Sequence, residues 1–185
     1  MTRREILRAA TVALLAPWAS LLGSACRAGD ESAAAGPPTK DGQGIEPLDL
    51  PRATWRKLLP GDAYAVLFEE DTERAFSSPL NAEKRRGVFV CAACFLPLFP
   101  SDTKYDSGTG WPSFFRPLQG HVGTKRDFAL VLPRTEYHCI RCGGHQGHVF
   151  DDGPAPTGLR YCNNGLALRF VPEGEPLPPL RTADA

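Results

Sequence analysis

The chain has 185 residues with 21 basic and 21 acidic side chains, so its formal net charge is zero. A balanced charge without a basic stripe excludes the electrostatic footprint of a nucleic-acid binder, and we expect no nucleic-acid partner. The length allows one domain with a modest core, and 18 Gly and 18 Pro indicate short strands joined by tight turns.

The first 26 residues are typical of an export signal. The Arg3-Arg4 pair stands before an uncharged Ala/Leu-rich run over residues 9–25, which resembles a twin-arginine signal. The alternative is a membrane anchor helix, but such a helix needs about 20 apolar residues. This run is shorter and contains Pro17. We therefore expect residues 1–26 to be a signal peptide and the protein to be exported to the periplasm or the outer face of a membrane.

Cys26 ends a Gly-Ser-Ala-Cys run that resembles a lipoprotein processing site. This predicts a lipid anchor on Cys26, with simple cleavage after Ala25 as the alternative. Residues 27–50 are poor in large apolar side chains and predict a flexible linker. The folded domain is then expected over residues 51–172, followed by a Pro-rich disordered tail over residues 173–185.

Two short helices are predicted at the start of the domain. Trp55 belongs to the first, with Thr54 as its N-cap, and Asp62 caps the second after a Pro60-Gly61 break. Beyond them, short apolar runs bounded by turn residues predict strands at 88–91, 128–132, 137–140, 148–150, 160–163 and 166–171. The sequence therefore predicts a mainly β domain of antiparallel strands with a small α content.

Four of the six cysteines form two C-x-x-C pairs, Cys91 with Cys94 and Cys139 with Cys142. Two such pairs are typical of a closed four-thiolate zinc site, which is structural because the protein fills every position. The alternatives are two disulfides, or one pair that acts as a redox dithiol. We predict one structural Zn²⁺, loaded in the reducing cytoplasm before export.

Cys162 is the cysteine of the domain that remains without a pair. A leftover thiol is either buried filler or a nucleophile. Arg160 lies two residues earlier, hence on the same face of a strand, where its guanidinium favours the thiolate. His145 and His148 suit acid/base or hydrogen-bonding roles, and a second metal site is the alternative.

Together these residues resemble a known family, because the chain is similar to peptide-methionine (R)-S-oxide reductases, also called methionine sulfoxide reductase B. The resemblance covers about residues 55–170 and includes both C-x-x-C pairs. Its motifs follow the family's order: TERAF (72–76), KYDSGTGWPSF (104–114), HQGHVF (145–150), DGP (152–154) and PTGLRYCNN (156–164).

The resemblance implies a zinc-containing fold of two antiparallel sheets with a shallow substrate site. It implies that Cys162 attacks the sulfoxide sulfur of the R epimer, so that methionine and a Cys162 sulfenic acid form. Oxidised proteins or peptides would be the substrates and an external thioredoxin-like thiol the reductant, and we expect a monomer. The other implied residues are His145 and His148 at the sulfoxide oxygen, Asn164, Asp152 and Arg160 around the nucleophile, and Trp111, Phe114 and Phe150 as substrate-binding residues.

Several positions depart from the family's pattern. Thr109 stands where many members carry a resolving cysteine. Gln146 and Asn163 replace the usual Leu and Ile beside catalytic positions, and Gly165 stands where Ser is common. These changes bear on how the enzyme is recycled and on the shape of its pocket.

Two other functions fit parts of the sequence. A zinc-stapled binding module explains the C-x-x-C pairs but not Cys162 or the two histidines. A thiol-disulfide oxidoreductase would use one C-x-x-C pair as its dithiol. One bound zinc together with a single alkylatable thiol in the folded domain fits only the reductase.

Overall fold

The computed structural model describes residues 44–128 and 133–184, all of which belong to one compact unit. The expected signal peptide, Cys26 and most of the expected linker lie outside these residues. In the described part of the chain, no helix has the length and apolar character needed to cross a membrane.

Two short helices, α1 (Arg52–Leu58) and α2 (Gly61–Glu69), open the fold. Each starts directly after a proline, and the carbonyls of Pro51 and Pro60 accept the first helical hydrogen bonds. A proline suits this place because it has no N–H that would need a partner. The expected N-caps Thr54 and Asp62 are therefore wrong, since both residues lie inside the helices.

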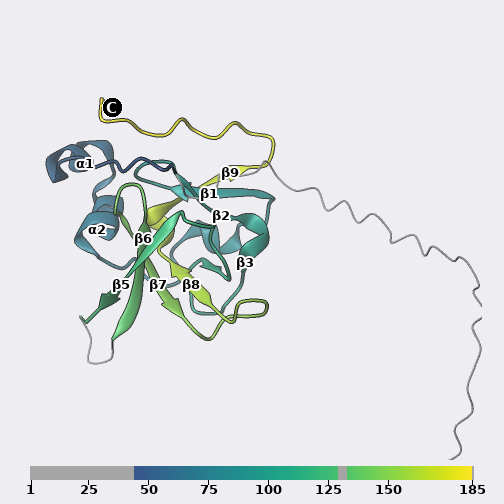
Figure 1. The fold of residues 1–185 in the computed structure, drawn as a ribbon. Coiled ribbons are helices and arrows are strands. Elements are labelled where there is room, and N and C mark those ends of the chain that lie inside the picture. Colours follow the sequence, from purple (N-terminus) through teal and green to yellow (C-terminus); the bar gives the residue numbers. More distant parts are fainter. Residues whose placement is uncertain (1–43, 129–132, 185) are drawn as a thin grey trace, which may run out of the picture. The chain divides into compact units, whose positions relative to one another are not determined.

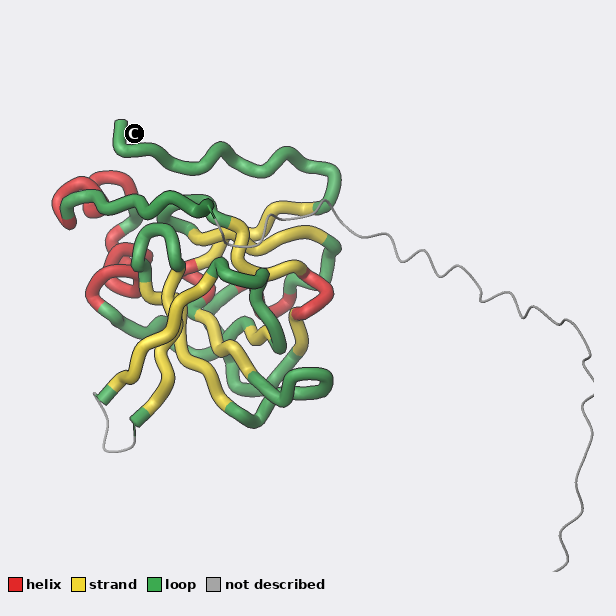
Figure 2. The backbone as a smooth tube through the Cα atoms, in the orientation of Figure 1, coloured by secondary structure: helices red, strands yellow, loops and turns green. Residues whose placement is uncertain are grey.

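The strands form two antiparallel sheets, which confirms the predicted mainly β fold (Figure 1). The smaller sheet has the order β2 (Pro97–Pro100), β1 (Gly87–Cys91), β9 (Leu168–Pro172). The larger sheet has the order β3 (Lys104–Tyr105), β4 (Ser113–Phe114), β8 (Arg160–Asn163), β7 (His145–Phe150), β6 (Arg134–Cys139), β5 (Val122–Asp127). Three 3-10 turns complete the elements: η1 (Pro79–Ala82), η2 (Ser101–Thr103) and η3 (Gly165–Ala167). Figure 2 shows α1 and α2 together at one side of the strands.

Aromatic side chains from both sheets form the core. Phe99 of the smaller sheet stacks on Phe114 of the larger one with ring centroids 4.2 Å apart, and Phe89 meets Phe114 edge-on at 5.0 Å. Tyr137 and Tyr161 continue this cluster across β6 and β8. Such pairs contribute beyond the area that they bury, so this cluster holds the two sheets together.

The predicted strand 160–163 has the observed bounds, whereas most of the others differ at their ends, and β2, β3 and β4 were not predicted. The strand expected at 128–132 is not found at Phe128, and residues 129–132 lie outside the described part. Its place is taken by β5, a strand that the sequence did not indicate because residues 123–126 are small or polar. An edge strand with polar side chains forms here because backbone hydrogen bonds to β6, and not apolar alternation, hold it. The last strand begins at Leu168, after η3.

Both ends of the described unit are more ordered than expected. Leu48 and Leu50 are buried in the core, so the end of the predicted linker packs on the domain. Residues 173–184 are not a disordered tail, because the Arg181 side chain donates to the Ala93 carbonyl at 2.7 Å and Arg141 donates to the Arg181 carbonyl at 2.7 Å. The prediction failed because proline-rich composition does not reveal such long-range backbone contacts.

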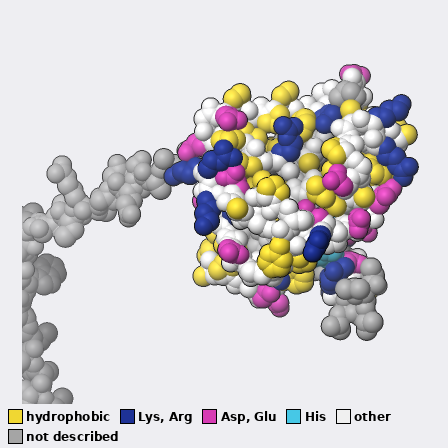
Figure 3. Space-filling model, turned by 180° about the vertical axis from the view of Figure 1, so that it is seen from behind, with side chains coloured by type: hydrophobic (Ala, Val, Ile, Leu, Met, Phe, Trp, Pro, Cys, Tyr) yellow, Lys and Arg dark blue, Asp and Glu magenta, His cyan; other side chains and the backbone are white. Residues whose placement is uncertain are grey.

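The surface carries both signs of charge. On the face shown in Figure 3, lysine and arginine side chains are interspersed with acidic ones. This distribution matches the zero formal net charge of the chain.

Gly147 on β7 lies directly against the backbone of β8. A Cβ at this position would lie 1.9 Å from the carbonyl oxygen of Cys162 on β8. We expect Gly147→Ala to lower the free energy of unfolding by about 1–3 kcal/mol, the usual range for overpacking, because the two strands must separate. Urea unfolding with an unchanged m-value measures this loss.

The matched control is Gly61→Ala at the start of α2, where a Cβ would meet no atom within 4 Å. This variant should be at least as stable as the wild type. Equal stability of Gly147→Ala and wild type would contradict the close approach of β7 and β8.

Candidate active site and metal centre

Cys162 lies in the middle of the larger sheet. Its backbone pairs with Ser113 of β4 on one side and with His148 of β7 on the other. Because side chains alternate along a strand, Tyr161 and Asn163 point to the interior while Cys162 and Arg160 share the opposite face. Tyr161 accordingly joins the aromatic core, and Cys162 is only partly buried. The strand therefore presents the thiol at the surface of the sheet.

A small cavity of about 130 Å³, here called the thiol cavity, opens at Cys162. Four of the expected site residues line it with Cys162: Trp111, His148, Phe150 and Asn164. The rest of its wall comes from Thr72, Arg134, Gly147 and Asn163. Residues from separate segments of the chain thus meet at one thiol.

The two histidines occupy different layers. His148 lines the thiol cavity, and its Nε2 lies 2.8 Å from Asp127 Oδ2. His145 is nearly fully buried, and its ring centroid lies 5.4 Å from that of His148. The Nδ1 of His145 is 3.0 Å from Glu136 Oε1, at an angle that makes no hydrogen bond. Only His148 of this pair is in the cavity wall.

The charge around His148 comes mainly from Asp127 at the end of β5 and Arg134 at the start of β6, which are paired across these two strands. Arg134 donates to Asp127 Oδ2 at 2.6 Å, so this carboxylate oxygen contacts both a guanidinium and an imidazole. Burial lowers the pKa of His148, and the hydrogen bond to Asp127 opposes that change. His148 is therefore favoured as neutral imidazole near pH 7. Its proton lies on Nε2, because the ionised carboxylate of Asp127 can only accept.

Arg160 and Asp152 form a bidentate ion pair beside Cys162. Nε and Nη2 of Arg160 donate to the two carboxylate oxygens of Asp152 at 2.7 and 2.8 Å. Burial raises the pKa of Cys162, while the charge of Arg160 and a hydrogen bond from Thr109 act to lower it. Arg160 thus works in the expected direction, but burial outweighs it and the thiol keeps its proton in the free site.

Phe114 does not belong to the site. Its side chain is fully buried between Phe89 and Phe99, and it does not line the thiol cavity. Strand alternation explains this correction. On β4, Ser113 pairs with Cys162 while Phe114 pairs with Tyr161, so Phe114 faces the core.

Glu73 is a site-supporting residue that had no role assigned from the sequence. Its carbonyl accepts the Trp111 Nε1–H at 3.1 Å, and its amide donates to Asn164 Oδ1 at 3.1 Å. The buried carboxylate accepts from the amides of Gly165 and Leu166 at 2.5 and 3.1 Å. Burial raises the pKa of Glu73, and these two hydrogen bonds oppose it. In the sequence Glu73 follows Glu69, Glu70 and Asp71 and precedes Arg74, so its composition gave no signal that this acid would be buried.

A second cavity is larger but contains none of the expected chemistry. It has a volume of about 760 Å³ and lies between the helices, η1 and β9, lined mainly by apolar side chains. Among the described residues, Glu73 and Gly165 reach this cavity, whereas five of the expected site residues line the thiol cavity: Cys162, Trp111, His148, Phe150 and Asn164. The thiol cavity is the candidate active site because it contains Cys162, the predicted nucleophile.

Four cysteines form a second constellation at the ends of β1 and β6, the four-cysteine centre (Cys91, Cys94, Cys139 and Cys142). All four Sγ atoms lie within 4.8 Å of one another. The short distances run between the two C-x-x-C pairs, with Cys91 3.7 Å from Cys142 and Cys94 3.5 Å from Cys139. The four sulfurs therefore point at one common centre and not at two separate disulfides.

The four-cysteine centre has the size and donor chemistry of a metal site. A tetrahedral zinc ion with Zn–S bonds of about 2.3 Å has S···S edges of about 3.8 Å, close to the observed spacing. Burial raises the pKa of Cys91, and hydrogen bonding to Cys139 raises that of Cys142. Four thiolates packed this closely need a compensating cation, and an all-sulfur donor set suits a soft or borderline dication.

Comparisons with known proteins agree with this geometry. A family model described as "SelR domain" matches residues 59–172. The "Peptide methionine sulfoxide reductase MsrB" of Leptospira interrogans is 50% identical over 120 residues, which cover 64% of this chain and 92% of that protein. The protein of the same name from Agrobacterium fabrum is 51% identical over 121 residues, covering 65% and 90%. That from Caulobacter vibrioides is 47% identical over 140 residues, covering 75% and 88%.

The SelR match spans more than half of the chain and includes the thiol cavity and the four-cysteine centre. The similar proteins are matched over about nine tenths of their own length. The chain therefore belongs to the SelR-domain family of peptide methionine sulfoxide reductases, MsrB.

Proposed function

We propose that this protein reduces the R epimer of methionine sulfoxide in proteins and peptides, with Cys162 as the nucleophile. The observation that carries the proposal is the thiol cavity, where Cys162, Trp111 and His148 meet. The indole of Trp111, fixed by its hydrogen bond to Glu73, offers an apolar wall for the methyl group. The sulfoxide sulfur is chiral, because it carries a methyl group, an oxygen and the rest of the side chain in one fixed arrangement. A site that contacts the methyl group at Trp111 and the oxygen at His148 can therefore bind only one epimer productively.

In the proposed reaction the Cys162 sulfur attacks the sulfoxide sulfur while the sulfoxide oxygen takes a proton. Nδ1 of neutral His148 is the imidazole atom available to take the thiol proton and pass it to the oxygen, since Nε2–H is donated to Asp127. The attack forms a transient bond between the two sulfurs. This S–S bond and the S–O bond of the substrate then break while the hydroxyl oxygen bonds to the Cys162 sulfur, which leaves methionine and a Cys162 sulfenic acid. Methionine sulfur is reduced, Cys162 is oxidised, and no proton is gained or lost overall.

The remaining site residues position the reacting groups or change the charge around them. Asn164 bonds to the Glu73 amide and to the Gln146 carbonyl, so its amide ties the cavity floor together. Asp152 holds the guanidinium of Arg160, whose charge favours the thiolate as it forms. His145 contacts His148 edge-on and limits its movement. We assign Asn164, Asp152, Arg160 and His145 to positioning and charge, and Trp111 and Phe150 to substrate binding.

We further propose that the four-cysteine centre holds one structural Zn²⁺. The S···S spacing and the all-sulfur donor set support zinc, and a closed site of four protein ligands leaves no position for substrate. The ion would stabilise the fold and take no part in the reaction at Cys162.

The location proposed for the protein rests on the sequence alone. The Arg3-Arg4 pair, the apolar run and Cys26 support export by the twin-arginine route and a lipid anchor on the outer face of a membrane. The substrates would then be oxidised exported proteins. Fractionation of cells that produce the full chain is the measurement that tests this proposal.

The epimer preference gives the first test of function. With peptide-bound substrates, we expect turnover of the R epimer and none of the S epimer. Cys162→Ser should reduce turnover at least about 1000-fold, because the nucleophile is lost. Its thermal unfolding should match the wild type, since this half-buried thiol does not belong to the core. Equal rates on both epimers would contradict the proposed arrangement of Trp111 and His148 around Cys162.

The second test concerns the protonation of Cys162. Because burial raises the pKa of Cys162 above its ordinary value of 9.0, alkylation by iodoacetamide should accelerate with pH through and beyond pH 9. Arg160→Gln should move this profile to still higher pH, since the cation is lost while the charge of Asp152 remains. Mass mapping of the Cys162 peptide gives the rates.

Arg126→Gln is the matched control for this test. Arg126 is exposed on β5, which β7 and β6 separate from β8, so this variant should leave the profile unchanged. A profile centred near pH 7 in the wild type would contradict the protonated resting thiol.

Recycling of the enzyme gives the third test. Thr109 supplies no thiol, so we expect an external thiol to reduce the sulfenic acid: two equivalents form one disulfide and water and restore the Cys162 thiol. After one turnover without reductant, mass spectrometry should find a trappable sulfenic acid on Cys162. Thr109→Cys should convert it to a disulfide between Cys162 and the introduced thiol, because the Thr109 side chain hydrogen-bonds the Cys162 sulfur.

Thr124→Cys is the control, since it adds an exposed thiol on β5 away from the thiol cavity. It should leave the sulfenic acid intact. A disulfide between Cys162 and a cysteine of the wild-type chain would show instead that the protein carries its own resolving thiol.

A further inference from the structure

Gln146 and Asn163 are two polar residues buried completely inside the domain. They lie on the neighbouring strands β7 and β8, at the positions where the resembled family usually has Leu and Ile. A buried amide without hydrogen-bond partners costs about 1–3 kcal/mol by mutational data. Two such amides side by side therefore need partners, and the structure supplies them.

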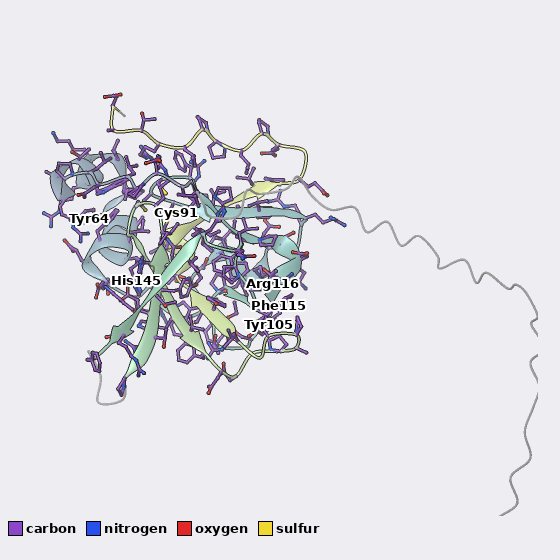
Figure 4. The ribbon with its side chains drawn as sticks, viewed as in Figure 1. Tyr64, Cys91, Tyr105, Phe115, Arg116 and His145 are labelled. Carbon is purple, nitrogen blue, oxygen red and sulfur yellow. The ribbon has the colours of Figure 1, made fainter. Side chains whose placement is uncertain are left out.

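A single chain of hydrogen bonds runs through both amides. Tyr137 donates its hydroxyl to Asn163 Oδ1 at 2.6 Å. Asn163 Nδ2 donates to the Asn164 carbonyl at 2.7 Å and to Gln146 Oε1 at 3.5 Å. Gln146 Nε2 then donates to the Sγ of Cys91 at 3.6 Å. The chain begins at Tyr137 on β6 and ends at Cys91 of the four-cysteine centre, which is labelled in Figure 4.

The direction of these bonds is fixed by one backbone group. The Asn164 carbonyl can only accept, so the amide nitrogen of Asn163 must face it. The second hydrogen of that nitrogen points to Gln146, which must therefore present its oxygen. The nitrogen of Gln146 is left facing Cys91, so this position calls for an acceptor and a thiolate sulfur provides one.

We propose that Gln146 is an outer-shell donor to the metal-bound thiolate of Cys91, and that Asn163 holds it in the donating orientation. The inference rests on the metal centre proposed above. Cys91 is fully buried, so the N–H of Gln146 can stabilise its thiolate where water has no access. Outer-shell partners of this kind orient metal ligands and tune their affinity.

The pairing also explains why the two departures occur together. Leu at 146 would leave one hydrogen of Asn163 without an acceptor, and Ile at 163 would leave Gln146 Oε1 and the Tyr137 hydroxyl without their partners. Each single change therefore leaves one buried amide without its partner, whereas the double change to Leu and Ile leaves no amide unpaired.

The experiment uses the full zinc-loaded chain and measures the transfer of zinc to a chromogenic chelator. Gln146→Met keeps the length of the side chain and removes the donor, so we expect zinc affinity to fall about 10–100-fold and release to accelerate. Gln119→Leu, at an exposed position, should release zinc like the wild type. In the Co²⁺-substituted protein, Gln146→Met should shift the sulfur-to-metal charge-transfer band to longer wavelength, because more charge stays on Cys91.

A second set of variants separates metal binding from stability. Asn163→Ile should lower the unfolding temperature, and adding Gln146→Leu should restore several degrees because no amide is left unpaired. The double variant should nevertheless release zinc as fast as Gln146→Leu alone. The inference would be overturned if Gln146→Met bound zinc as tightly as the wild type. It would also be overturned if zinc affinity changed in parallel with the unfolding temperature across all the Gln146 and Asn163 variants. A wild-type chain that binds no metal would overturn the metal centre as well.

Discussion

The meeting of four sulfurs at the ends of β1 and β6 is the constraint on which the rest of the structure depends. Cys91 ends a strand of the smaller sheet and Cys139 ends a strand of the larger one, so the centre joins the two sheets. Leu48 donates its amide to the Arg141 carbonyl at 2.6 Å, and Arg181 bonds to both C-x-x-C turns. Both ends of the described unit are thus attached at this centre, and its loss would release them together with the sheets.

Strand alternation links the four-cysteine centre to the thiol of Cys162. On β8, Asn163 turns inward to the hydrogen-bonded chain that reaches Cys91, while Cys162 turns outward to the thiol cavity. The backbones of β7 and β8 come together at Gly147, where a side chain would strike the Cys162 carbonyl. The position of the Cys162 thiol is therefore set by backbone packing along β8, and rigid strands hold side chains more accurately than loops do.

The electrostatics of the cavity favour a resting thiol that loses its proton only during reaction. Burial dominates over the cation of Arg160 at Cys162, and burial likewise favours neutral His148. A neutral thiol beside a neutral imidazole withstands oxidants better than a thiolate, because the thiolate is the reactive species. Such a pair suits an enzyme whose surroundings contain the oxidants that create its substrate.

Spacing in the sequence was enough to determine the two cysteine pairs, the unpaired Cys162, the two helices and the mainly β class, because each depends on local periodicity or on residue chemistry. Most of the site's members also followed from motifs. Tertiary structure decided what depends on contacts between distant segments: that Phe114 belongs to the core, and that Glu73 fastens Trp111. It also decided that β5 forms from polar residues and that Gln146 and Asn163 are partners. Strand register brings these groups together, and register is fixed by packing across the sheets and not by neighbours along the chain.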